Sequence, residues 1–293
     1  MSFKRLYRLL SEILLLKRNI FEDISYFLQG LGKKRIACPY CKTKDYIIYD
    51  KKYLVIDICK CKQCGLFFVN PIYAAKKVEE FYDNCYSSGA TFIPEKQSLE
   101  SMIRTGDFSS IGKDFRDRLS IIKQLSNGNR LLEFGSSWGY FLYQAKQYGF
   151  ICKGVEISKK RSYFGQKYLG VDIINNLAAI NEKFDIIYTS HTLEHLVDLQ
   201  GIFDEFYKML VPGGKLIIEV PNFDPEVKGK SVYSIIGKVH PLGFNKDFFE
   251  KNLQKHGFLD ISIAGNYQDL LKEPSQRLPL KDVIIVQAKK RRN

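Results

Sequence analysis

Two glutamates lie near a turn of small residues in the middle of this 293-residue chain, one shortly before the turn and one at the end of the next apolar segment. The apolar segment Leu131–Phe134 contains Glu133, and the next apolar segment ends on Glu156. Small residues let a backbone approach a phosphate or a ribose closely, and an acid after the second strand can hold both ribose hydroxyls. The pattern therefore predicts a nucleotide-like ligand at this turn. The small residues of the turn are Gly135, Ser136, Ser137 and Gly139.

The glycine spacing narrows the kind of nucleotide. A dinucleotide fingerprint needs glycines at i, i+2 and i+5, whereas this turn has Gly135 and Gly139 at i and i+4. With Glu133 two residues earlier, the turn resembles motif I of the class I S-adenosylmethionine-dependent methyltransferases, acid-x-Gly-x-Gly-x-Gly, with Ser137 at the middle glycine. The resemblance implies that Glu133 holds the methionine amino group of S-adenosylmethionine and that Glu156 holds its ribose. The predicted cofactor-binding residues are Glu133, Gly135, Ser137, Gly139, Glu156, Ile157, Asn176 and Ser190.

A second group of reactive side chains follows the apolar segment 184–188. In open α/β sheets ligands bind beyond the carboxyl ends of the strands, so we expect His191, Glu194 and His195 to face the acceptor substrate. His191 and His195 are four residues apart and would share one face if this turn were helical. The segment resembles the LEH form common in methyltransferases, which is followed here by an LxPGG turn at Leu210–Gly214.

Three roles compete for these side chains. His195 can act as a general base toward a hydroxyl group, because imidazole titrates near neutral pH. Alternatively, the cluster can bind a divalent metal. That arrangement is similar to the ExxEH-plus-His pattern of the metal-dependent small-RNA 2′-O-methyltransferases, from which it departs at His191. In the third interpretation His195 only packs or caps the start of a helix. The residues concerned are His191, Glu194, His195 and the later His240.

Two pairs of cysteines form a separate motif, Cys38-Pro-Tyr-Cys41 and Cys61-Lys-Gln-Cys64. Four thiolates from two such turns make a tetrahedral zinc site, and a site closed by four protein ligands is structural. Cysteines in this pattern indicate an intracellular metal site rather than disulfides, so we expect a cytoplasmic protein. Cys59 lies close to the second pair, and we expect it to point away on its strand.

Strands alternate with helices over the second half of the chain. This pattern predicts an α/β fold with a doubly wound, Rossmann-like parallel sheet and a carboxyl-terminal antiparallel hairpin. We expect the polar stretch 87–110 to be a loop that covers the site as a lid. The predicted units are a basic amphipathic helix at 1–35, a zinc ribbon at 36–72, a helical connector and lid at 73–125, and a methyltransferase domain at 126–293.

The net charge of +13 is concentrated on the appendages. Residues 1–35 carry eight basic and three acidic side chains, and residues 289–292 are all basic, whereas the predicted catalytic body is nearly neutral. Apolar residues recur at helical spacing over residues 3–31, so this helix either packs on protein or docks peripherally on the inner membrane face. No apolar run in the sequence is long enough to span a bilayer.

The cysteine pairs followed by methyltransferase motifs resemble bacterial sugar methyltransferases with an amino-terminal zinc module, over about residues 36–222. The carbon-methylating members carry a further large domain, so the resemblance favours O-methylation of a sugar or glycan precursor in polysaccharide biosynthesis. An RNA methyltransferase is the first alternative, favoured by the basic appendages but not by the neutral body. A catalytically degenerate fold that acts as a binding subunit is the second, and Ser137 is the residue that favours it.

Overall fold

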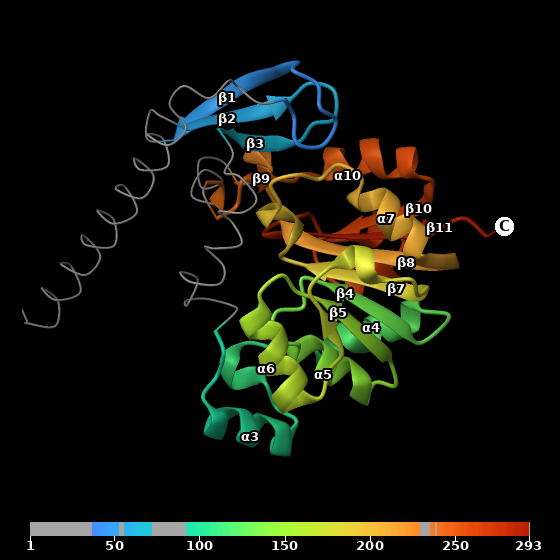
Figure 1. The fold of residues 1–293 in the computed structure, drawn as a ribbon. Helices are drawn as coiled ribbons and strands as arrows, with labels where there is room; N and C mark the ends of the chain where they lie inside the picture. Colours follow the sequence, from blue (N-terminus) through green and yellow to red (C-terminus); the bar gives the residue numbers. More distant parts are fainter. Residues whose placement is uncertain (1–36, 53–55, 72–91, 229–234, 238, 293) are drawn as a thin grey trace, which may run out of the picture.

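The computed structural model describes residues 37–52, 56–71, 92–228, 235–237 and 239–292 (Figure 1). The amphipathic helix predicted for residues 3–31 lies outside the described residues, as does the start of the predicted lid. Among the helices that are described, none is both long and apolar enough to cross a membrane.

A seven-stranded sheet forms the centre of the protein, in the order β10-β11-β8-β7-β4-β5-β6. Strands β6, β5, β4, β7 and β8 pair in parallel, and β11 pairs antiparallel with both β8 and β10. The predicted doubly wound sheet with a carboxyl-terminal hairpin is therefore confirmed. The strands are β4 Arg130–Phe134, β5 Ile151–Val155, β6 Ile173–Ile174, β7 Phe184–Ser190, β8 Leu210–Pro221, β10 Phe258–Ala264 and β11 Val283–Lys290.

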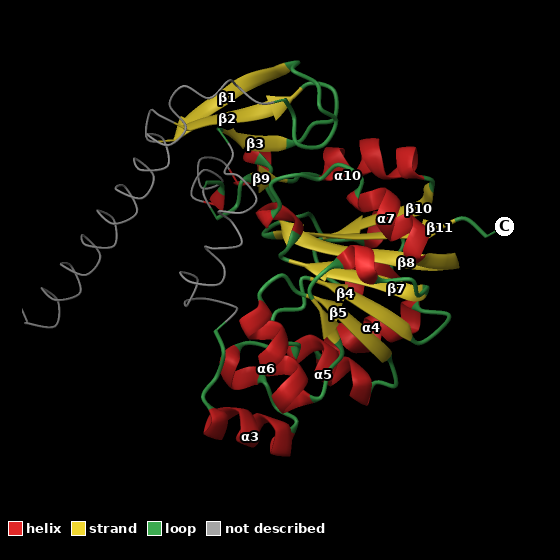
Figure 2. Cartoon of the chain, in the orientation of Figure 1, coloured by secondary structure: helices red, strands yellow, loops and turns green. Residues whose placement is uncertain are grey.

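Helices cover both faces of this sheet (Figure 2). Neighbouring residues of a strand point to opposite faces, and both Ile186 and Ile187 of β7 are fully buried. Ile186 belongs to the core that holds Phe141 of α5, whereas Ile187 belongs to the core that holds Phe203 of α7. A parallel strand that is buried on both faces needs apolar residues at consecutive positions, which explains why residues 186–188 of β7 are all apolar.

The helices are short, and single 3₁₀ turns occur between several of the elements. The α-helices are α3 Lys96–Thr105, α4 Arg116–Leu125, α5 Tyr140–Gln147, α6 Lys159–Leu169, α7 Ile202–Met209, α8 Pro225–Lys228 and α10 Lys246–Asn252. The 3₁₀ turns are η1 Ser109–Ile111, η2 Leu177–Ala179, η3 Leu193–His195, η5 Leu253–His256, η6 Gln268–Leu271 and η7 Pro274–Gln276.

The prediction of a polar loop over residues 87–110 is wrong for the part that the structure describes. This part contains helix α3, whose Leu99 and Met102 are buried against the body of the protein. Phe108 is also fully buried, and the carbonyl of Phe92 accepts a hydrogen bond of 2.9 Å from Trp138. Two apolar residues three positions apart are enough to anchor a short helix, although the overall composition of the stretch is polar.

A second, four-stranded sheet has the order β1-β2-β3-β9, and Figure 1 shows it beside α10. Strands β1 and β2 lie between the two cysteine pairs, with Cys61 at the end of β2, and β3 follows the second pair, whereas β9 comes from the methyltransferase half of the chain. The strands are β1 Tyr46–Lys52, β2 Ile56–Cys61, β3 Phe67–Asn70 and β9 Leu242–Gly243. The pairing of Phe68 with Leu242 therefore joins two parts of the chain that are far apart in sequence.

Candidate active site

A cavity of about 670 Å³ lies at the carboxyl ends of β4, β5, β7 and β8. The position agrees with the rule that ligands bind beyond the carboxyl ends of parallel strands. Both acidic and basic side chains line the cavity. The acids are Glu133, Glu156, Glu194 and Glu219, and the basic residues are Lys113, Arg118, Arg161, His191, His195 and His240.

The turn after β4 approaches the cavity through its backbone. Gly135 has a φ of +85°, and a Cβ at this position would lie 2.0 Å from Oγ1 of Thr192. Ser137 also adopts a positive φ, of 49°, at the position of the expected middle glycine. Its amide donates a 2.8 Å hydrogen bond to Glu156, and the amide of Ser158 donates a second, of 2.9 Å. The serine is thus compatible with the turn geometry that the motif requires.

Glu133 is the acid nearest the start of the turn, and its side chain lines the cavity. It is 5% exposed, and its Oε2 accepts no hydrogen bond from any residue that the structure describes. Burial, together with the charge of Glu156, raises the pKa of Glu133 well above its ordinary value. A buried carboxylate oxygen that lacks a donor fits a ligand with an ammonium group, such as the methionine part of S-adenosylmethionine.

The other predicted cofactor residues lie in different places. Ile157 and Ser190 line the cavity. Asn176 is not among the residues that line it, and its side chain accepts a hydrogen bond from the amide of Ala178 at the start of η2. Gly139 begins α5 with a φ of +79°, and a Cβ there would lie 2.6 Å from the side chain of Val171. Its role in the structure is close packing of the helix.

His191 lies at the end of β7 and is not part of a helix. It has a left-handed φ of 49°, and the following turn η3 covers only three residues. The helical turn that would place His191 and His195 on one face is therefore not formed. The His191 ring instead lies between two carboxylates, with Nδ1 3.4 Å from Glu194 and Nε2 3.4 Å from Glu219. Burial opposes its charge, but these two glutamates outweigh burial and raise the pKa of His191 to about 9.

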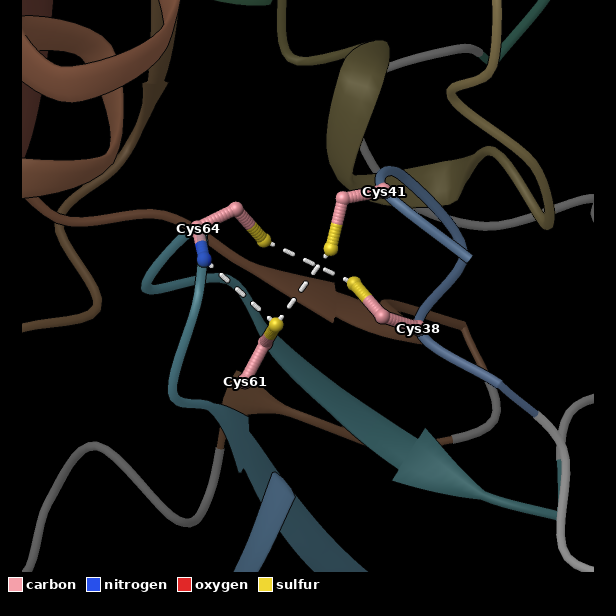
Figure 3. A group of neighbouring side chains, drawn as sticks. All are labelled: Cys38, Cys41, Cys61 and Cys64. Carbon is pink, nitrogen blue, oxygen red and sulfur yellow. Dashed lines mark hydrogen bonds between the residues drawn. The ribbon is translucent and has the colours of Figure 1, made fainter. Parts of the chain in front are cut away.

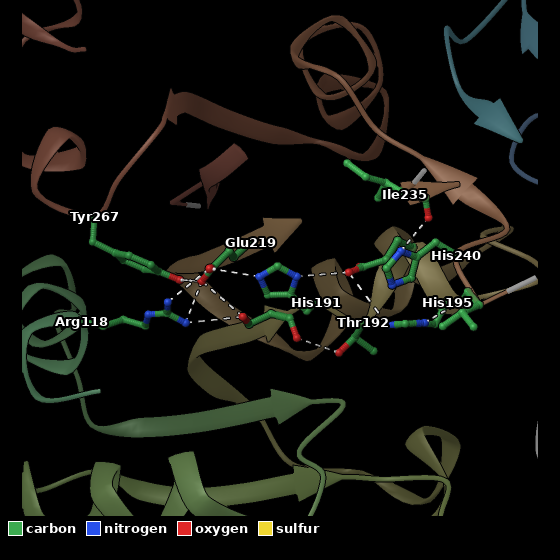
Figure 4. Close-up of polar contacts among 11 residues, drawn as sticks. Arg118, His191, Thr192, His195, Glu219, Ile235, His240 and Tyr267 are labelled. Atoms are coloured by element: carbon green, nitrogen blue, oxygen red, sulfur yellow. Dashed lines mark hydrogen bonds and ion pairs between the residues drawn. The ribbon is translucent and has the colours of Figure 1, made fainter. Parts of the chain in front are cut away.

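His195 and His240 face each other across the cavity wall, with ring centroids 4.5 Å apart (Figure 4). Nδ1 of His195 lies 2.8 Å from the carbonyl of Val239, and Nδ1 of His240 lies 3.0 Å from the carbonyl of Ile235. Burial and the neighbouring His195 lower the pKa of His240 to about 4. The structure therefore brings His240 to the LEH segment, 45 residues away in sequence.

Further residues complete the site and were missed from the sequence. Arg118 of α4 pairs with Glu219 of β8 at 2.7 Å and donates a 2.7 Å hydrogen bond to the hydroxyl of Tyr188. The hydroxyl of Tyr267 donates to Glu219 at 2.6 Å, as Figure 4 shows. Burial opposes the charge of Glu219, but His191 and Arg118 lower its pKa to about 2. The sequence signal that could have identified this network is Glu219, an acid within the otherwise apolar end of strand β8.

Comparison with known proteins agrees with this geometry. Residues 109–262 match a family model described as a methyltransferase domain. The chain belongs to this methyltransferase family. Phosphoethanolamine N-methyltransferase 1 of Triticum aestivum is 30% identical over 209 residues, which cover 67% of this chain and 41% of that protein. Phosphoethanolamine N-methyltransferase 3 of Arabidopsis thaliana is 28% identical over 151 residues, covering 48% of this chain and 30% of that protein.

Solved structures support the methyltransferase fold. Phosphoethanolamine N-methyltransferase 2 of Haemonchus contortus, in complex with phosphomonomethylethanolamine and S-adenosylhomocysteine, superposes with a TM-score of 0.54 at 16% identity. The match covers 73% of this chain and 60% of that chain. At this identity the similarity shows the fold alone. In the comparison with the two plant relatives, the chain spans less than half of the length of each of them.

The four cysteines of the two CxxC pairs lie close together (Figure 3). The four Sγ atoms lie within 4.8 Å of one another, and the two closest pairs are each 3.5 Å apart. Four sulfurs around one zinc ion at about 2.3 Å would lie about 3.8 Å from each other. The cluster could therefore hold zinc, and Cys59 is not part of it, as expected. Its members are Cys38, Cys41, Cys61 and Cys64.

Residues 37–52 and 56–71, which include the four cysteines and are called the cysteine module, contact the segments that carry His195 and His240. Four residues after His195, the amide of Leu199 donates to the carbonyl of Pro39 at 3.2 Å. Next to His240, the carbonyl of Pro241 accepts a 2.9 Å hydrogen bond from Val69 of β3. The module therefore takes part in positioning this side of the cavity.

Proposed function

We propose that this chain transfers the methyl group of S-adenosylmethionine to a hydroxyl oxygen of a sugar or glycan precursor, with His195 as general base. The observation that carries the proposal is that one cavity holds both halves of the required chemistry. Glu133 and Glu156 supply the cofactor half, and the cluster around His195 supplies the acceptor half.

The cofactor carries its methyl group on a positively charged sulfur, which makes that carbon electrophilic. The protein has to align an oxygen with this carbon and to remove the proton from the oxygen. The carbonyl of Val239 can only accept a hydrogen bond, so it selects the tautomer of His195 with a proton on Nδ1. The lone pair of the neutral ring is then on Nε2, 4.0 Å from Glu194, whose charge would stabilise the protonated ring.

A phosphorylated amino alcohol is the second candidate acceptor, because the similar plant proteins are phosphoethanolamine N-methyltransferases. Such an acceptor needs a cation for its phosphate. Lys113 lines the cavity near Arg118, and burial together with that neighbour lowers the pKa of Lys113. Phosphate binding at this place would raise the pKa of the lysine, because an anion favours the charged form.

The first experiment measures S-adenosylmethionine binding by isothermal titration calorimetry. We expect Glu133→Gln to weaken binding about 10- to 100-fold, because it removes one charge-assisted hydrogen bond. Glu250→Gln, on the exposed side of α10, is the matched control and should bind as the wild type does. If the wild-type chain binds no S-adenosylmethionine, the methyltransferase proposal is wrong and the binding-subunit interpretation gains support.

The second experiment identifies the acceptor atom. The protein is incubated with isotopically labelled S-adenosylmethionine and either sugar nucleotides with glycan precursors or phosphoethanolamine, and the products are characterised by mass spectrometry and NMR. A new O-methyl group on a sugar supports the proposal, whereas an N-methyl product replaces it with the second candidate. RNA remains an outcome of a parallel gel-shift assay, where a steep dependence on salt would indicate phosphate contacts.

The cysteine cluster fits a structural zinc ion, and we include this ion in the proposal. Metal analysis should find one equivalent of zinc per wild-type chain and little in Cys61→Ser. Cys152→Ser is the control, because Cys152 lies on β5 outside the cluster. Retention of zinc in Cys61→Ser would exclude the four-thiolate site.

Peripheral membrane contact through residues 1–35 is a further part of the proposal, and it is argued from the basic amphipathic sequence alone. Co-sedimentation with anionic vesicles should therefore decrease when residues 1–35 are removed. Equal sedimentation of both forms would contradict it.

A further inference from the structure

We propose that Glu194, His195 and His240 form a binding site for a divalent cation of the first transition row, and that this cation holds the acceptor hydroxyl. The inference deepens the proposed methyl transfer and depends on it for the identity of the acceptor. Each of the three residues offers one ligand atom, and these atoms lie within 4.8 Å of one another. Two imidazoles and one carboxylate are a ligand set that suits such cations.

The two histidines are already oriented as metal ligands. Each donates Nδ1–H to a backbone carbonyl, that of Val239 for His195 and that of Ile235 for His240. A carbonyl can only accept, so the lone pair of each neutral ring is on Nε2. Metal-binding histidines characteristically donate their other ring nitrogen to such a partner, which fixes both the tautomer and the ring orientation.

Glu194 is the observation that points to a ligand. The residue is 2% exposed, and neither of its carboxylate oxygens accepts a hydrogen bond within the described part of the chain. Its nearest charged neighbour is His191, at an ion-pair distance of 3.4 Å, and His191 is shared with Glu219. Buried carboxylates are normally held by several hydrogen bonds or by a metal ion. A bound cation would satisfy the oxygens that protein donors leave unsatisfied.

The position of the cluster indicates what the cation would do. All three residues line the cavity that contains Glu133 and Glu156, so open positions of the cation would face the acceptor. A cation lowers the pKa of a hydroxyl that it binds, as it does for bound water. The acceptor oxygen then forms a bond to the methyl carbon while the carbon–sulfur bond breaks and its electron pair stays on sulfur. The hydroxyl proton leaves to water. Where the cation is bound, Nε2 of His195 is one of its ligands, and activation by the cation replaces the general-base role given to His195 in the proposed function, while the methyl transfer itself is unchanged.

The proposed cation also favours one class of acceptor substrate. With three protein ligands, an octahedral cation keeps positions for two acceptor oxygens, so a vicinal diol would bind better than a lone hydroxyl. Sugars present such diols, whereas a primary amine with a distant phosphate does not.

The test is a titration of the full chain with Mn²⁺, followed by the electron paramagnetic resonance signal of the unbound ion. Mn²⁺ is chosen because it prefers oxygen and nitrogen ligands to the thiolates of the cysteine cluster. We expect one Mn²⁺ site in the wild type and at least a tenfold loss of affinity in both Glu194→Gln and His240→Gln. His256→Gln is the control, since His256 bonds to Tyr40 and Asp204 outside the cavity, and it should bind Mn²⁺ like the wild type.

S-adenosylmethionine affinity, measured on the same samples, shows whether each variant is folded and separates the two proposals. Unchanged Mn²⁺ binding in Glu194→Gln and His240→Gln, or no Mn²⁺ binding by a wild type that binds S-adenosylmethionine, would overturn the metal site and leave the methyltransferase proposal in place. Mn²⁺ binding by a wild type that binds no S-adenosylmethionine would support the metal site and sink the methyltransferase proposal.

Discussion

The two halves of the cavity are built in different ways. The proposed cofactor half comes from one continuous stretch, in which the turn after β4 meets the acid after β5 through the hydrogen bond from the Ser137 amide to Glu156. The acceptor half combines residues from α4, β7, η3, β8 and the segment before β9, and the cysteine module holds two of these segments. A site formed by residues close together in sequence can be read from a local motif. A site formed by residues far apart in sequence depends on the whole fold.

The largest expected effect is on the acceptor half. His195→Asn should lower kcat by about 10²- to 10⁴-fold, because it removes the general base or a ligand of the proposed cation. S-adenosylmethionine affinity, measured by calorimetry, should stay within about twofold of the wild type, since a merely structural loss would weaken both. A parallel loss of cofactor binding would show that the two halves are not separable.

The buried network between the halves should affect stability next. Arg118→Met removes one of the two cationic partners of the buried Glu219, the other being His191, and should lower the free energy of unfolding by about 3 kcal/mol in a urea titration. Glu219 also predicts the response to acid, because its pKa is lowered from 4.5 to about 2. Its contribution to stability is complete above about pH 4.5 and is lost as the pH falls toward 2. Glu219→Gln should lack this part of the acid loss, and an unchanged acid profile would contradict the assignment.

A test of the cofactor turn compares two glycines with the same backbone conformation. Gly135 and Gly149 both have positive φ, of 85° and 79°, but only a Cβ at Gly135 would meet other atoms, those of Thr192. Gly149→Ala should cost about 1 kcal/mol from strain alone, and Gly135→Ala about 2–3 kcal/mol together with a loss of cofactor affinity. Thermal unfolding and calorimetry measure both effects. Equal costs would mean that the turn can move away from η3.

The smallest effect is expected where the cysteine module meets the surface. Lys42 pairs with Asp198 at 2.7 Å, and both side chains are about half exposed. Lys42→Ala should therefore change the free energy of unfolding by less than about 1 kcal/mol and leave cofactor affinity unchanged. Cys61→Ser in the cysteine module should lower turnover more than cofactor binding, because the module contacts the acceptor half. A selective loss of cofactor binding in this variant would reverse the comparison.

Sequence reasoning identified the elements that have a local cause. The turn at Gly135 and the acid Glu156 followed from residue types at fixed spacing, and the parallel strands followed from short apolar runs such as residues 186–188 within β7. It failed where the cause was not local. Helix α3 has only two buried residues, and the rest of its sequence is polar or exposed. The positive φ of His191 prevents a helix from starting at that residue.

The sequence by itself determined the small-residue turn after β4, the doubly wound sheet and the two CxxC turns, because each depends on residues close together or on a repeated pattern. Only the tertiary structure decided which charges meet in the acceptor half. Arg118 pairs with Glu219 across 101 positions, and His240 reaches His195 across 45. Contacts at such separations are set by how strands and helices pack, and no local spacing in the chain encodes them.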